Sequence, residues 1–113
     1  MRHVIKNFVA ILKVEIEDLA ADIELLLAEN QRKKDAGTIT DYVYLENQAL
    51  FRHELLGVQS FARILAQTDP DAFQKLDDLI VHLRDAFREG GYVRAINICV
   101  ERKMKKVTQY VTQ

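Results

Sequence analysis

Residues that crosslink a polypeptide chain or interrupt its helices are scarce in this sequence. Its 113 residues include one cysteine, one proline, four glycines and no tryptophan. The single Cys99 excludes an internal disulfide and any metal site built from several cysteines, and it is typical of a protein from a reducing compartment. Because Gly and Pro are rare, long stretches can be helical without interruption.

Strong net charge and long apolar runs are also absent. The formal charge is −1, with 29% charged and 49% hydrophobic residues, the balance of a soluble globular domain. No whole-molecule field favours nucleic acid or a membrane surface, and no apolar run approaches the ~20 residues of a membrane span. The first apolar run is interrupted by Lys13 and lacks a cleavage site, so no signal peptide is predicted. We expect one cytoplasmic domain over residues 1–113.

Apolar residues recur three and four positions apart along most of the chain, which indicates amphipathic helices. The first predicted helix covers residues 3–35 and the second covers residues 41–67. The third begins at Pro70 and ends before Gly90-Gly91, and the fourth covers residues 92–111. The apolar stripe of the first helix consists of Ile5, Phe8, Leu12, Ile16, Leu19, Ile23, Leu26 and Leu27, and that of the second consists of Val43, Leu50, Phe61, Ile64 and Leu65.

The predicted helix ends rest on local signals. Gly37 follows three basic residues and suits a C-terminal cap, and Thr40 or Asp41 suits the N-cap of the second helix. Asp69 followed by Pro70 is a start signal for the third helix. Gly90-Gly91 provides its end.

Four amphipathic helices joined by short loops predict an all-α fold, an up-down-up-down four-helix bundle with a long N-terminal helix. At 1.5 Å per residue the first helix is ~48 Å long and extends beyond the third and fourth. An apolar stripe on such an overhang is normally covered by another chain. We therefore expect a homo-oligomer, most simply a dimer, or another protein partner.

The charges of the first and fourth helices are opposite. The first is acidic, and the fourth carries Arg102, Lys103, Lys105 and Lys106. In an up-down bundle these helices are antiparallel neighbours, which places Arg102, Lys105 and Lys106 near Asp22, Asp18 and Glu15. The alternative is that the basic strip binds phosphates, with Tyr92 and Tyr110 nearby. It has no interleaved aromatic platform, so paired helix flanks are the preferred interpretation and nucleic acid is disfavoured.

Acidic residues on one flank of the first helix could also hold a divalent metal. Glu15, Asp18 and Asp22 have spacings that suit magnesium or manganese, as in helical nucleotide pyrophosphohydrolases. Those enzymes carry a second Glu-x-x-Asp on a facing helix, which this chain lacks. A metal-dependent hydrolase that adds Glu46 or Glu54 stays an alternative, while a solvated face is preferred and no cofactor is expected.

Four polar residues of the second helix fall on or beside its apolar stripe. Asn47 and Glu54 point into the stripe, and Glu46 and His53 lie along one edge of it. Polar groups that a helix buries need hydrogen-bond partners. We expect these four residues to form a buried or interfacial set that fixes the register of helices or subunits.

The run Arg52-His53-Glu54-Leu55-Leu56-Gly57 resembles the active helix of histidine phosphotransfer domains, which are four-helix bundles. His53, Leu55 and Gly57 fit their His-x-Leu-Lys-Gly pattern, and Leu56 stands where the lysine would be. The resemblance implies that His53 accepts a phosphoryl group and that Gly57 clears space for the partner.

The chain carries no complete catalytic constellation. The preferred interpretation is therefore a non-catalytic helical adaptor or regulatory subunit that works by protein–protein contact. Histidine phosphotransfer and metal-dependent hydrolysis are the alternatives.

Overall fold

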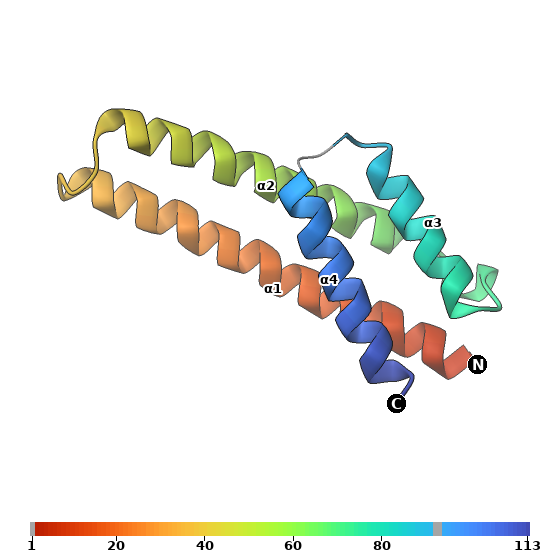
Figure 1. Ribbon diagram of the computed structural model, residues 1–113. Coiled ribbons are helices and arrows are strands. Elements are labelled where there is room, and N and C mark those ends of the chain that lie inside the picture. Colours follow the sequence, from red (N-terminus) through yellow and green to blue (C-terminus); the bar gives the residue numbers. More distant parts are fainter. Residues whose placement is uncertain (1, 92–93) are drawn as a thin grey trace.

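The structure, a computed structural model, describes residues 2–91 and 94–113, and these are helical with short connections (Figure 1). The helices are α1 (Arg2–Asp35), α2 (Asp41–Gln67), α3 (Leu76–Arg88) and α4 (Arg94–Val111), with a short 3₁₀ helix, η1 (Pro70–Ala72), before α3. The described residues contain no strand. For the described residues, the predicted all-α class with four helices, of which the N-terminal one is the longest, is confirmed. Tyr92 and Val93, predicted to begin the fourth helix, lie outside the described residues.

The two longest helices, α1 and α2, form a hairpin. Gly37 has a φ of +72°, and the amides of Gly37 and Thr38 donate to the carbonyls of Lys34 and Lys33, the bonding pattern of a Schellman cap. Thr40 then caps α2, because its hydroxyl accepts from the amide of Val43 at 3.1 Å. Both predicted end signals are confirmed.

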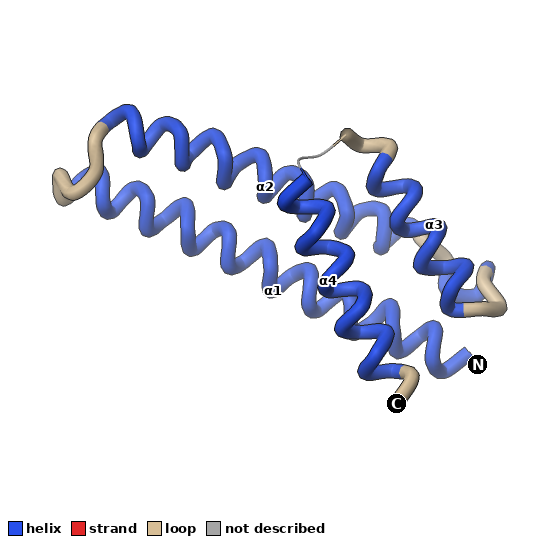
Figure 2. Tube along the Cα trace, viewed as in Figure 1, coloured by secondary structure: helices blue, strands red, loops and turns tan. Residues whose placement is uncertain are grey.

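The two shorter helices cover only one end of this hairpin. The helix α4 lies diagonally across it, and α3 lies beside α2 and α4 (Figures 1 and 2). The molecule is 54 Å long but only 26 and 19 Å in its other dimensions, because the hairpin extends past the short helices. An even up-down-up-down bundle along the whole length is not established by this arrangement.

The buried core lies where all four helices meet. We call this end of the molecule the body: residues 2–18 of α1, 57–67 of α2, and all of η1, α3 and α4. Among the residues whose burial is described, every buried apolar side chain except Ile23 belongs to the body: Ile5, Phe8, Leu12, Ile16, Val58, Phe61, Leu65, Leu79, Leu83, Phe87, Ile96, Val100, Met104 and Val107. At its centre the rings of Phe61 and Phe87 meet edge to face, with centroids 5.2 Å apart, a favoured aromatic geometry.

The start of the third helix differs from the prediction. Asp69 and Pro70 begin η1, where the Asp69 carboxylate accepts from the amide of Asp71 at 2.9 Å. The chain then turns extended at Phe73, and α3 begins only at Leu76. Phe73 packs against the core and against the ring of His82, 5.2 Å away. Tertiary packing of Phe73 therefore interrupts a helix that the local signal alone would continue.

The other end of α3 follows its glycine signal. Gly91 has a φ of +67°, which glycine adopts without steric cost. Beyond this turn Glu101 of α4 bridges back to α3, 3.2 Å from Arg88 Nη2 and 3.3 Å from Arg84 Nε. None of the described helices combines the length and the apolar character that a membrane span requires.

Candidate functional site

The hairpin continues beyond the body as a two-helix extension, which we call the arm: residues 19–35 of α1, the loop, and residues 41–56 of α2. Seven of the eleven exposed large apolar side chains among the described residues belong to it: Leu25, Leu26, Tyr42, Val43, Leu45, Leu50 and Leu56. Leu50 and Leu26 continue the stripes that are buried in the body, yet they are 47% and 45% exposed. The arm is therefore a half-covered part of a helical bundle.

A buried polar contact joins the two helices of the arm. Asn30 is only 3% exposed. Its Nδ2 donates to the backbone oxygen of Tyr44 at 3.1 Å, and its Oδ1 accepts from Asn47 Nδ2 at 3.2 Å. Sequence reasoning missed Asn30, although its position seven residues after Ile23 places it on the apolar stripe. This contact ties α1 to α2 in the arm, where Ile23 is the one buried apolar side chain among the described residues, and a buried polar contact of this kind fixes helix register.

One side of the arm continues the surface that α3 and α4 cover in the body. On α1, Glu15 contacts α4, and Asp22, Leu26, Glu29 and Lys33 follow it at helical spacings of 7, 11, 14 and 18 residues. On α2, Phe61 contacts α3 and Ile64 packs on the core. Val43, Glu46, Leu50 and His53 precede these two residues by 11 or 18 positions. We call these eight arm residues the open face.

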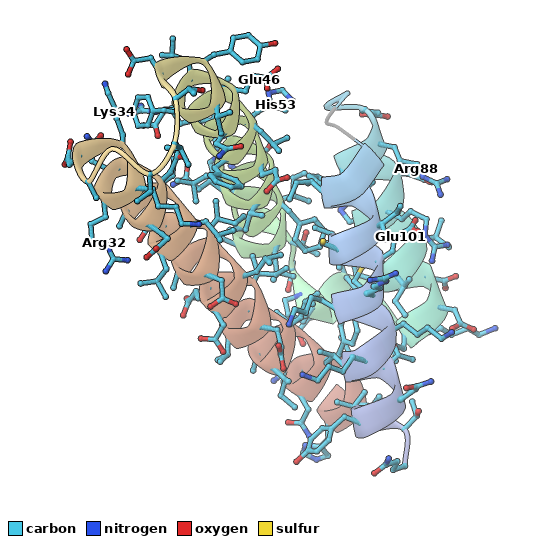
Figure 3. The ribbon with its side chains drawn as sticks, turned by 60° about the vertical axis from the view of Figure 1, so that its left-hand side comes forward. Arg32, Lys34, Glu46, His53, Arg88 and Glu101 are labelled. Atoms are coloured by element: carbon cyan, nitrogen blue, oxygen red, sulfur yellow. The ribbon has the colours of Figure 1, made fainter. Side chains whose placement is uncertain are left out.

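The open face carries charge around its apolar centre. Asp22, Lys33, Glu46 and His53 are all exposed. Figure 3 shows Arg32 and Lys34 at the far end of α1, and Glu46 beside His53 along α2. Lys34 lies over the ring of Tyr44, 4.3 Å from its centroid, and Glu29 forms an ion pair with Arg32. The tip of the arm is thus basic on α1, while Asp22 at its base is acidic.

The four polar residues predicted as a set on α2 do not form one buried network. Asn47 and Glu54 are half-buried, whereas Glu46 and His53 are exposed, the order that the helical wheel predicts. Asn47 bonds to Asn30, and Glu46 accepts from the hydroxyl of Tyr42 at 3.0 Å. An interfacial role for the exposed pair stays a prediction.

His53 is exposed, but Gly57 one turn later is buried. The glycine lies at the boundary between arm and body, next to Val58 of the core. Phosphoryl transfer through His53 remains a prediction from the sequence.

The predicted charge pairing between α1 and α4 centres on Glu15. Its two carboxylate oxygens accept from Lys103 Nζ at 3.0 Å and from Lys106 Nζ at 2.9 Å. The sequence pattern predicts Lys106 beside Glu15, as the structure shows, but it places Arg102 beside Asp22 and does not predict Lys103 as a partner of Glu15. Hydrogen bonds from Lys106 and Lys103 hold the pKa of the Glu15 carboxyl below its ordinary value of 4.5. Glu15 is therefore a structural ion-pair partner that fastens α4 to α1.

The carboxylates proposed as metal ligands do not converge. Among the described residues, no group of three or more His, Cys, Asp or Glu side chains is arranged to hold a metal ion. Asp18 and Asp22 are exposed on the flank of α1. The hydrolase alternative stays a prediction from the sequence.

Lowering the pH should weaken the attachment of α4 through Glu15. The folded-state pKa lies below the unfolded value of 4.5, so the pair stabilises the fold above that pH. The contribution is lost as the pH falls from 4.5 through the lower folded-state value. Glu15→Gln should lower the free energy of unfolding by about 1 kcal/mol at neutral pH. In this variant the free energy of unfolding should also depend less on pH below 4.5.

Urea unfolding at a series of pH values measures this dependence, with the exposed Glu17→Gln as the control. Identical pH profiles for the parent and Glu15→Gln would contradict the assignment.

Several grooves on the body are lined by α4. One of about 510 Å³ lies beside Ile11, Glu15 and Lys106, and another, of about 610 Å³, lies between α3 and α4 beside Arg84 and Glu101. A further groove of about 590 Å³ lies near the C-terminal end of α4, beside Leu76 and Val111. In the first two of these grooves the carboxylates of Glu15 and Glu101 are already paired with basic side chains that join helices. The arm is therefore the stronger candidate for a functional surface.

Comparisons of the chain with protein families, with curated proteins and with solved structures found no match.

Proposed function

We propose that this protein is a non-catalytic helical adaptor or regulatory subunit that acts through its arm. The body serves as an up-down-up-down four-helix base that holds the arm in place, and the open face of the arm binds another polypeptide. One observation carries the proposal: Leu26 and Leu50 lie on the same helix faces as buried core residues, yet they are nearly half exposed. Exposed apolar clusters of this kind mark interaction sites.

The geometry also suits a helical partner. In the body, α3 and α4 lie on the hairpin and complete the core. A helix or helix pair placed on the open face would continue that layer and would bury Leu26, Val43 and Leu50. Burial of these partly exposed side chains supplies a hydrophobic driving force of roughly 25 cal/mol per Å² of apolar area.

Substitutions confined to the open face should abolish association without unfolding the protein. We expect the parent chain in fresh extracts of cells that produce it to elute well above its monomer mass of 13.1 kDa. A Leu26→Ser and Leu50→Ser double variant should elute as a monomer. The melting temperature and helical circular dichroism of the purified variant should match the parent apart from the loss of any partner contribution.

The matched control places the same change on the body. Val81 and Ile98 are 49% and 39% exposed, so Val81→Ser and Ile98→Ser remove similar apolar area from a different surface. The control should elute with the parent. Elution of the parent as a monomer, or of the arm variant with the parent, would refute the proposed function.

A further inference from the structure

Charges on the open face have opposite orders on its two helices. On α1, Asp22 lies toward the base of the arm and Lys33 toward the tip. On α2, His53 lies toward the base and Glu46 toward the tip. Each pair flanks an exposed leucine, Leu26 on α1 and Leu50 on α2. Each helix therefore presents an exposed leucine between different polar groups, and on α1 the carboxylate of Glu29, next to Leu26, is already paired with Arg32.

A two-fold axis across the arm would match these ends to each other. If two arms lie antiparallel with their open faces together, α1 faces α1 of the second copy and α2 faces α2. Asp22 then lies opposite Lys33 of the second copy, and the carboxylate of Glu46 lies opposite the imidazole of His53. Both contacts occur twice, because such an interface is isologous.

One position of the two-fold axis brings together both the pair on α1 and the pair on α2. A chance arrangement of charges would not place the midpoints of the two pairs at the same level of the hairpin. The midpoint between Asp22 and Lys33 lies two to three residues before Asn30, and the midpoint between Glu46 and His53 lies two to three residues after Asn47. Asn30 and Asn47 are in contact in the antiparallel hairpin, so the two midpoints are level with each other. Leu26 and Leu50 lie within two residues of them.

From this self-complementarity we infer that the arm binds the arm of a second copy of this chain, antiparallel about a two-fold axis near Leu26 and Leu50. The inference rests on the proposed function, because it names the partner of the same surface. In the dimer the paired arms form a four-helix bundle between the two bodies. Each tip then abuts the end of the α3–α4 layer of the other copy.

The body already shows the same kind of contact at the preceding position of the acidic flank. Glu15 lies seven residues before Asp22, on the same side of α1, and there it binds Lys103 and Lys106 of α4. Where α4 no longer covers α1, Asp22 has no ion pair among the described residues. Lys33 of a second copy would form an ion pair with Asp22, as Lys103 and Lys106 of α4 do with Glu15.

The area of the arm is sufficient for a small stable interface. Seventeen helical residues at 1.5 Å each give a length of about 25 Å, and two adjacent helices are about 20 Å wide. The projected area of this face is about 500 Å² per copy. The accessible area of the side chains on the face is larger than this projected area. Small specific interfaces bury roughly 600 Å² per partner, so one pair of arms can hold a dimer.

Charge exchange tests both the partner and its orientation. Sedimentation velocity of the purified full chain, from low micromolar to several hundred micromolar, should show a dimer. Asp22→Lys and Lys33→Glu should each raise the dissociation constant about tenfold or more, because each creates two like-charge contacts. An equimolar mixture of the two variants should dimerise as the parent does, since every such contact is then between opposite charges.

The control variant is Glu24→Lys, which reverses an exposed charge on the opposite side of α1, 200° from Asp22. It should leave the dissociation constant unchanged. Equal effects of Asp22→Lys and Glu24→Lys, or no recovery in the mixture, would overturn the antiparallel pairing. If the purified chain is a monomer, the inference that the arm binds a second copy is wrong. If that chain still elutes as a complex in cell extracts, in an arm-dependent manner, the proposed function stands with a different protein on the arm.

Discussion

Phe61→Ala should reduce the free energy of unfolding by about 3–5 kcal/mol. Phe61 is fully buried in the body and meets Phe87 edge to face. Its removal takes away the transfer free energy of the ring and leaves a cavity that the surrounding helices cannot fill completely. Small domains have total stabilities of roughly 5–15 kcal/mol, so the variant should unfold at a much lower urea concentration or fail to fold at room temperature.

The matched comparison is Leu45→Ala in the arm. Leu45 is 63% exposed and lies on α2 about 140° away from Leu50, outside the open face. Its truncation should change stability by no more than about 0.5 kcal/mol. Urea unfolding followed by circular dichroism, at one protein concentration for all variants, gives both values. Similar costs for the two substitutions would contradict the division into a packed body and a half-covered arm.

Asn30→Ala should cost about 1–3 kcal/mol, the second largest effect we expect. The substitution removes the hydrogen bonds that the buried amide of Asn30 makes with Tyr44 and Asn47, and it leaves Asn47 without its acceptor. Because Ile23 is the one buried apolar side chain of the arm among the described residues, the loss of stability should appear in the arm first. Amide hydrogen exchange of residues 24–34 and 42–50 should accelerate more than exchange in the body.

A double-mutant cycle isolates the contact between Asn30 and Asn47. The cost of the double alanine variant should be smaller than the summed costs of the single variants, since the second substitution removes a bond that is already broken. The exposed Glu24→Ala serves as the control for changes in α1. Additive costs, or faster exchange confined to the body, would show that Asn30 does not hold the arm together.

The local signals of the sequence predict the helices well but predict less about what covers them. Gly37, Thr40 and Gly91 act at the positions that the sequence indicates, because their effects depend only on groups within a few residues along the chain. The start of α3 was predicted wrongly, since Phe73 leaves the helical path to pack against the core and His82. That packing depends on residues distant in the sequence.

The candidate site could be predicted only in part for the same reason. Helical spacing places Leu26 and Leu50 on the apolar stripes, and helix length predicts that α1 extends past its shorter neighbours. The spacing of apolar residues does not show how far along a stripe the other helices cover it. The coverage stops at the arm, because α3 and α4 are short and α4 crosses diagonally (Figure 1). The role of Asn30 could not be predicted, because its hydrogen-bond partners on α2 are brought to it only by the folding of the hairpin.

We propose that the arm, and not the body, makes the contacts of this protein in the cell. Site-specific photo-cross-linking tests it most directly, with the photoreactive residue benzoylphenylalanine in place of Leu50 on the arm or of Val81 on α3. These side chains are similarly exposed, at 47% and 49%. We expect a discrete cross-linked product from the Leu50 position, of twice the chain mass if the partner is a second copy, and none from the Val81 position. Products from Val81 alone, or from neither position, would contradict it.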